Sequence, residues 1–201
     1  MARAPVFTVG LTGTIASGKE EVATLFVEAG FAFFSLSDRV KEEAALRGFQ
    51  RPSRADLQRI GNELRGTFGP AVWAERTYEK IIDAAVRDAV VDGFRNPAEV
   101  AHFQQRARFC LVAVDASIEV RFKRLLERGR PGDPTTLAEF SQIDARDRGI
   151  GEPAEGQHVG ACLQLAQFTI LNDGTLAELR ANFEALLREF KGGPYVRARC
   201  Q

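Results

Sequence analysis

The stretch GTIASGKE at residues 13–20 constrains the fold most strongly, because it has a short apolar run before it and a helical pattern after it. A glycine loop between a strand and a helix turns backbone N–H groups toward an anion, and the helix N-terminus adds a favourable field. The sequence therefore predicts a phosphate-binding loop in which Lys19 reaches the terminal phosphates of a nucleotide. The alternative is a glycine turn that holds a lysine by chance.

The last position of this motif departs from the pattern G-x-x-x-x-G-K-[ST], because Glu20 replaces the hydroxyl residue that contacts magnesium. Mg²⁺ takes oxygen ligands and keeps several waters, so a carboxylate there could ligate it directly or through water. We interpret the loop as a nucleotide-binding site with altered metal ligation, rather than as a site that has lost binding. Its predicted nucleotide-binding residues are Gly13, Thr14, Ile15, Ala16, Ser17, Gly18, Lys19 and Glu20.

Strand-like apolar runs alternate with helical patterns along the whole chain. The runs lie at residues 6–11, 31–35, 89–91, 109–114 and 168–171. Helices are expected after the glycine loop, over 37–48, from Ser53, from Pro70, and from the two T-x-x-E boxes at Thr136 and Thr175. Such alternation predicts an α/β fold in three layers, with a five-stranded parallel sheet flanked by helices. At 201 residues we expect a single domain over 1–191 and a tail over 192–201.

Composition excludes several classes of protein. Lysine plus arginine equals aspartate plus glutamate, at 27 each, which argues against a nucleic-acid-binding protein. Three scattered cysteines indicate no disulfide framework and fit a reducing compartment. No signal peptide and no apolar run long enough to span a membrane are recognisable. We expect a cytoplasmic protein that binds neither membrane nor nucleic acid; its oligomeric state stays open.

The segment VVDGFRNPAEV at residues 90–100 places Asp92 and Arg95 at the carboxyl end of a strand, where ligands of open α/β sheets bind. Asp92 could hold the water shell of a magnesium ion, and Arg95 could grip a phosphate with two hydrogen bonds. The alternative is a strand-ending turn with surface charges.

An arginine-rich helix follows at residues 120–130. Arg121, Arg124 and Arg128 share one helical face, and the opposite face, expected to be buried, carries Ile118, Phe122, Leu125 and Leu126. Further arginines follow at positions 130, 146 and 148. Such a set is typical of a lid that closes over phosphates, and also of a solvated charged helix.

Two further charged residues have open interpretations. Asp38 follows the second predicted strand and could orient an acceptor hydroxyl or take its proton; as an acid near a helix cap it would be equally well placed. Arg65 could contact the acceptor or form an ion pair on the helix surface.

Taken in order, GLTGTIASGKE, SLSDRV, DGFRN, RFKRLLERGR and LNDGTLAEL resemble segments of P-loop kinases of the nucleoside monophosphate kinase group. Within that group the chain is most similar to dephospho-coenzyme A kinase-like and deoxynucleoside monophosphate kinase-like proteins, over nearly its whole length. Three departures stand out: Glu20, an arginine one residue early in DGFRN, and a single acid, Asp38, in the acceptor segment.

The resemblance implies a P-loop NTPase fold with an acceptor-binding helical region at about 37–88 and an arginine-rich lid at about 128–156. It implies ATP and Mg²⁺ as cofactors and a small nucleotide-like acceptor. Metal would lie near Glu20 and Asp92, and Arg124, Asn172 and Gly174 would contact ATP. The implied catalytic residues are Lys19, Asp38, Arg95 and Arg128, and the implied acceptor-binding residues are Asp38, Arg65, Arg95 and Asn96.

Two functions follow as hypotheses. The first is an ATP- and Mg²⁺-dependent phosphotransferase acting on a nucleoside or deoxynucleoside monophosphate or on dephospho-coenzyme A. The second is a nucleotide-binding regulatory module with little turnover, since Glu20 departs from the motif. A similar module also occurs fused ahead of deaminase domains of the deoxycytidylate type, and the tail at 192–201 could be the start of such a fusion.

Overall fold

The computed structural model describes residues 6–130 and 132–192, and the predicted tail lies, apart from its first residue, outside them. The strands form one five-stranded parallel sheet in the order β2-β3-β1-β4-β5. The strands are β1 (Phe7–Gly13), β2 (Ala32–Ser35), β3 (Asp88–Phe94), β4 (Arg108–Asp115) and β5 (Phe168–Leu171). All five predicted strands are confirmed, and β3 continues three residues beyond its predicted end.

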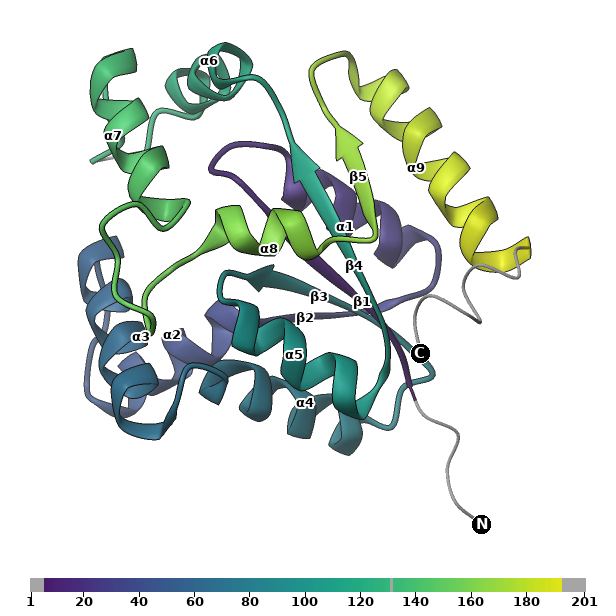
Figure 1. The fold of residues 1–201 in the computed structure, drawn as a ribbon, viewed down its shortest axis with the longest axis horizontal. Coiled ribbons are helices and arrows are strands. Elements are labelled where there is room, and N and C mark those ends of the chain that lie inside the picture. The colour runs from purple at the N-terminus through teal and green to yellow at the C-terminus, as the bar shows by residue number, and fades with distance from the viewer. Residues whose placement is uncertain (1–5, 131, 193–201) are drawn as a thin grey trace.

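Helices cover both faces of the sheet, which confirms the predicted three-layer α/β fold (Figure 1). They are α1 (Lys19–Glu28), α2 (Leu36–Leu46), α3 (Arg54–Phe68), α4 (Val72–Ala84), α5 (Pro97–Arg106), α6 (Ile118–Arg128), α7 (Leu137–Asp147), α8 (Val159–Leu165) and α9 (Leu176–Gly192). The boxes at Ser53 and Thr136 form as predicted, each side chain bonding the backbone N–H three residues on. Among the described residues, no helix has both the length and the apolar character to cross a membrane.

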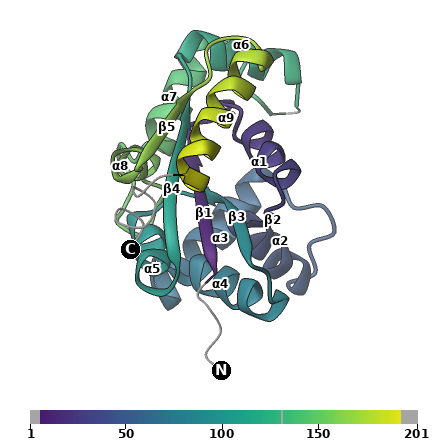
Figure 2. The same ribbon diagram turned by 90° about the vertical axis from the view of Figure 1, so that its right-hand side faces the viewer.

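Two clusters of apolar side chains lie between the sheet and the helices on its two faces. Figure 2 shows the sheet and these helices after a turn of 90°. On one face, α1 and α9 pack through Phe26 and Phe183, whose rings meet edge to face at 4.8 Å. On the other face, Trp73 of α4 and Phe103 of α5 lie fully buried. Because both faces are covered, the strands are near-continuous apolar runs, which is why their positions were readable from the sequence.

The prediction missed two helices. α5 begins at Pro97, behind an Asn96 cap and a Glu99 capping box, so a helix-start signal was present in the sequence. α8 spans seven residues, too few for a helical period to show. The expected buried face of α6 is also partly wrong: Leu126 is exposed, and Arg121 from the opposite face is buried instead.

Candidate active site at the carboxyl edge of the sheet

The phosphate loop joins β1 to α1 and is shaped by its two glycines. A Cβ on Gly13 would lie 2.0 Å from the Val114 carbonyl oxygen, and one on Gly18 would lie 2.2 Å from the Asn172 side-chain nitrogen. Gly18 also has a φ of +90°, which disfavours other residues. The loop therefore packs against the ends of β4 and β5 so closely that glycine is required at both positions.

Lys19 begins α1 and folds back over the loop. Its Nζ donates to the carbonyl oxygens of Gly13 (2.8 Å) and Thr14 (3.0 Å). Burial lowers the pKa of the Lys19 ammonium, and the carboxylate of Asp92 partly opposes this. An ammonium whose hydrogen bonds, within the described part of the chain, go only to carbonyl oxygens is well placed to exchange them for phosphate oxygens, which carry full charge.

Asp92 lies near the end of β3, beside β1. Its Oδ1 is buried without a hydrogen-bond partner among the described residues. Burial raises the pKa of the Asp92 carboxyl, against the opposing effects of Lys19 and Arg95. A buried carboxylate oxygen with open coordination, next to a phosphate loop, fits a hydrated divalent ion.

Glu20 points outward from the first turn of α1. Its side chain is 79% exposed, and Oε1 lies 4.0 Å from Nη2 of Arg130. In the described part of the chain, no three or more His, Cys, Asp or Glu side chains form a group that could hold a metal. An ion here would accordingly take most of its ligands from phosphate oxygens and water, which is ordinary for Mg²⁺.

A further carboxylate supports the loop and was not predicted. Asp115 ends β4, and its Oδ1 accepts a 2.6 Å hydrogen bond from the Thr14 hydroxyl. The rule that singled out Asp92, a polar residue at the carboxyl end of a strand, would also have found Asp115. The loop is thus braced from a neighbouring strand at its first residue.

The three residues expected to contact ATP outside the loop, Arg124, Asn172 and Gly174, differ in their exposure and contacts. Asn172 is buried; its side-chain nitrogen donates to the Ser17 carbonyl oxygen (2.9 Å), and its oxygen accepts from Arg124 Nη2 (3.3 Å). Arg124 Nη1 is buried without a partner among the described residues. Gly174 is exposed. Asn172 therefore supports the phosphate loop and links it to Arg124.

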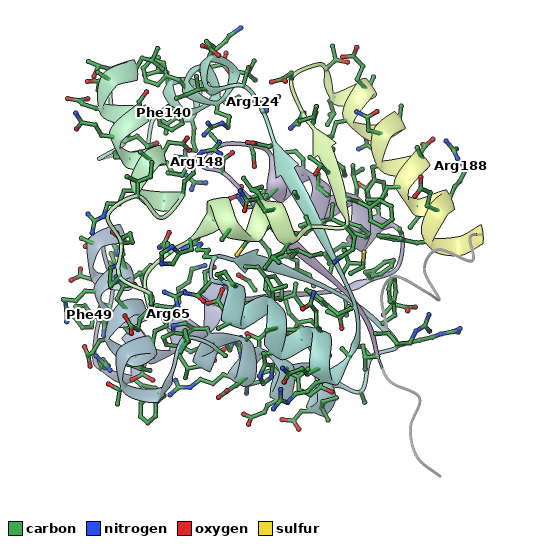
Figure 3. All side chains as sticks on the ribbon, viewed as in Figure 1. Phe49, Arg65, Arg124, Phe140, Arg148 and Arg188 are labelled. Atoms are coloured by element: carbon green, nitrogen blue, oxygen red, sulfur yellow. The ribbon has the colours of Figure 1, made fainter. Side chains whose placement is uncertain are left out.

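The lid arginines do not form one open face. Arg121 is 2% exposed and makes two hydrogen bonds to Asp144 of α7, at 2.6 and 3.0 Å. Arg128 is paired with Asp133, at 3.0 Å. Arg148, just after α7, lies between α7 and the phosphate loop (Figure 3), with Nη2 3.7 Å from Asp115 Oδ2. Sequence spacing alone did not separate these roles, because the partners come from α7, from β4 and from the loop after α6.

Two of the four predicted acceptor-binding residues, Arg65 and Asn96, have partners inside the protein. Arg65 is buried and donates two hydrogen bonds to Glu99 Oε1, at 2.9 and 3.3 Å. Asn96 caps α5, and its side chain holds the carbonyl oxygens of residues 154 and 156. In this structure both side chains are occupied by contacts within the protein, and neither is presented to an acceptor.

Asp38 and Arg95 are accessible. Asp38 lies in the first turn of α2 and pairs with Lys41 at 2.8 Å. The backbone of Arg95 is held at both ends: its N–H donates to Glu99 (2.8 Å), and its carbonyl oxygen accepts from the His158 N–H (2.6 Å). Arg95 itself is exposed and electrostatically coupled to Lys19. The structure therefore fixes the backbone of this exposed arginine near the loop.

The raised pKa of Asp92 leads to a prediction about the stability of the fold. A raised folded-state pKa means that the fold disfavours the ionised carboxylate, so Asp92 stabilises the fold only at low pH, and this contribution is lost as pH rises through the raised pKa. We expect Asp92→Asn to raise the free energy of unfolding at neutral pH, measured by urea denaturation in EDTA. The exposed control Asp83→Asn should change it by less than about 0.5 kcal/mol. A less stable Asp92→Asn protein would contradict this.

Comparison with solved structures shows that kinases share this fold. Two solved structures share the fold: shikimate kinase from Bacteroides thetaiotaomicron (TM-score 0.54, 16% identity, covering 94% of this chain and 99% of that one) and dephospho-CoA kinase from Campylobacter jejuni (TM-score 0.53, 17% identity, 91% and 96%). At such identities the likeness shows the fold, which is that of P-loop kinases. It extends over several kinase types, so the narrower resemblance to the nucleoside monophosphate kinase group stays a prediction.

Sequence relatives define the family. No family model matches the chain. A UPF0200 protein of Hyperthermus butylicus is 36% identical over 187 residues, which cover 93% of this chain and 95% of that protein. The UPF0200 protein PH1008 of Pyrococcus horikoshii is 33% identical over 187 residues, covering 90% and 95%. The chain, with its P-loop kinase-like fold, belongs to the UPF0200 family.

Proposed function

We propose that this protein is an ATP- and Mg²⁺-dependent phosphotransferase that moves the terminal phosphoryl group of ATP to a small, nucleotide-like acceptor. The observation that carries the proposal is that the Lys19 ammonium, which within the described residues bonds only two loop carbonyls, acts electrostatically on Asp92, whose buried Oδ1 has no hydrogen-bond partner in the same part of the chain. A cation and a carboxylate so placed suit a phosphate chain and its divalent ion.

Each residue has a part in this proposal. The loop amides and Lys19 bind the phosphates, and Asp92 and Glu20 would hold the divalent ion through its waters. The ion neutralises phosphate charge when bound. Arg95, whose backbone is fixed by Glu99 and His158, orients an anionic group of the acceptor. Because phosphoryl transfer depends on positioning and electrostatics, these contacts could supply most of the catalysis.

Asp38 is the residue that we propose contacts the acceptor hydroxyl. Its carboxylate lies in the first turn of α2, which follows β2 directly, and its ion pair with Lys41 is exposed. Such a pair is worth little in water and can open without much loss of stability. We propose that Asp38 accepts a hydrogen bond from the acceptor hydroxyl. Dephospho-coenzyme A carries both a free hydroxyl for Asp38 and an anionic group for Arg95. In nucleoside and deoxynucleoside monophosphates a sugar hydroxyl would bond Asp38, while the phosphate contacts Arg95 and is itself the group that accepts the transferred phosphoryl.

The test is ATP-to-ADP conversion across a panel of these acceptors. With Mg²⁺ present, we expect one acceptor class to stimulate turnover and EDTA to abolish it. A phosphorylated acceptor, identified by mass spectrometry, would distinguish transfer from simple hydrolysis. Bound ATP without stimulation by any acceptor would contradict the kinase assignment.

That outcome would favour the second candidate, a nucleotide-binding regulatory module. The exposed position of Glu20, where the motif carries a magnesium-binding hydroxyl, is the observation in its favour. Such a module would bind ATP with the same loop and with Lys19, yet turn it over slowly.

A further inference from the structure

Glu99 of α5 is a fully buried carboxylate that bonds two kinds of donor. Its Oε1 accepts from Nε (3.3 Å) and Nη2 (2.9 Å) of Arg65, which belongs to α3 and is labelled in Figure 3. Its Oε2 accepts from the backbone N–H groups of Arg95 (2.8 Å) and Asn96 (3.1 Å). The side chains of Arg65 and Glu99 are 6% and 0% exposed. One carboxylate oxygen is therefore engaged by a charged side chain, and the other by the backbone that carries Arg95.

The capping of α5 does not by itself explain why Arg65 is buried beside Glu99. Glu99 closes the capping box with Asn96, but a glutamine serves equally at that position of a capping box. A buried carboxylate is costly without a cation, so the choice of an acid makes a second buried charge necessary. A buried ion pair is also weak evidence for stability, because apolar residues of similar volume often replace it without loss. The pair therefore calls for a reason other than stability.

The exposed side chain nearest in sequence to this carboxylate is Arg95, and it has the opposite charge. Glu99 already bonds the Arg95 backbone N–H, so the flexible Arg95 side chain begins beside the carboxylate. Opposite charges attract strongly where water is excluded. Within the described residues, however, the Glu99 oxygens bond Arg65 and two backbone N–H groups, and not the Arg95 guanidinium. The charge of Arg95 instead acts on Lys19 and Asp92 at the phosphate loop.

Resting on the proposed function, we infer that Arg65 is a positioning residue: it neutralises Glu99 and so keeps that carboxylate from pairing with Arg95, whose guanidinium stays available to the anionic group of the acceptor. Arg65 does this without contacting the acceptor. If Arg65 were removed, Glu99 Oε1 would lose both of its side-chain donors, and the space that the Arg65 guanidinium fills would open beside it. Arg95 is then the cation able to take its place.

The experiment measures KM for the acceptor and the affinity of the β,γ-imido analogue of ATP. The acceptor probes are the nucleoside monophosphates, the deoxynucleoside monophosphates and dephospho-coenzyme A. We expect Arg65→Gln to raise KM for the stimulating acceptor by about tenfold or more, the effect of losing a charge-assisted hydrogen bond, and to change the calorimetric affinity of the ATP analogue by less than about twofold. The control Arg59→Gln makes the same change at an exposed site of α3 and should alter neither.

The double variant Arg65→Gln with Glu99→Gln separates this role from a direct contact with the acceptor. The glutamine introduced at position 99 can cap α5 through its carbonyl oxygen and bond the glutamine introduced at position 65 through its amide, so no buried charge remains. With no carboxylate to attract Arg95, KM should lie within about threefold of the unaltered value. A KM that is about tenfold higher in the double variant would overturn the inference, and this comparison holds even if Arg65→Gln alone does not fold.

A second readout requires no turnover. The ¹⁵N NMR signal of the Arg95 Nε–H should shift in Arg65→Gln, where we expect the ion pair with Glu99, and should return close to its unaltered position in the double variant. An unshifted Arg95 signal in a folded Arg65→Gln protein would overturn the inference and leave the proposed function standing. Absence of acceptor-stimulated turnover by the unaltered protein would overturn the proposed function, while the NMR comparison would still decide whether Arg65 keeps Glu99 away from Arg95.

Discussion

Lys19→Ala is expected to lower acceptor-stimulated ATP consumption by a factor on the order of 100 to 1,000, the typical cost of removing one preorganised donor from a centre of developing charge. The only hydrogen bonds described for its side chain are to two loop carbonyls, so the fold should survive the change. Steady-state rates at saturating ATP and acceptor, with circular dichroism to check folding, measure this. The exposed Lys123→Ala on α6 is the matched control and should keep full activity.

The two candidate functions respond differently to this substitution. In a phosphotransferase, Lys19→Ala removes turnover whether or not ATP still binds. In a regulatory module there is no acceptor-stimulated rate to lose, and only ATP affinity falls. A Lys19→Ala protein that turned over ATP and acceptor at the unaltered rate would exclude this site as the catalytic centre.

The largest effect on stability is expected at Asp144. Asp144→Ala leaves the 2%-exposed Arg121 guanidinium without its two charged hydrogen bonds and should lower the free energy of unfolding by about 3 to 5 kcal/mol, measured by urea denaturation. Glu127→Ala, which breaks an exposed 4.0 Å contact with Lys123 on α6, should cost less than about 1 kcal/mol.

A double substitution distinguishes the cost of leaving Arg121 without its partner from the cost of losing the whole Arg121–Asp144 pair. Arg121→Met with Asp144→Leu removes both charges and refills the space with apolar atoms, so we expect it to recover most of the stability lost in Asp144→Ala. If the double variant were as unstable as the single one, the lost hydrogen-bond geometry between α6 and α7, and not the unpaired charge, would be responsible.

Local patterns accounted for most of the fold. Each strand buried on both faces appears as a run of apolar residues, and α3 and α7 begin at the predicted capping boxes of Ser53 and Thr136. The phosphate loop was also readable, because its function depends on residues that are consecutive in the chain. The short α8 carries too few residues for a period, so it could be found only in the folded structure.

The sequence did not predict which side chains pair with one another in the folded protein. Arg65 and Asn96 had the chemistry expected of acceptor ligands, but Glu99 and the 154–156 segment occupy them. Arg121 appeared equivalent to Arg124 and Arg128, although one is buried against Asp144 and another is paired with Asp133. Nothing in the spacing of arginines along a helix indicates which aspartate of another element will face each one.

The chain's own order of residues thus specified the α/β class, the glycine loop and the edge of the sheet where charged residues gather, since periodicity and motif spacing are local properties. Tertiary structure decided which of those charged side chains pair with groups inside the protein and which stay accessible to a ligand. Contacts such as Thr14 with Asp115 join residues 101 positions apart. Such pairings depend on strand order and on the packing of helices from distant parts of the chain, and these are settled only when the whole core forms.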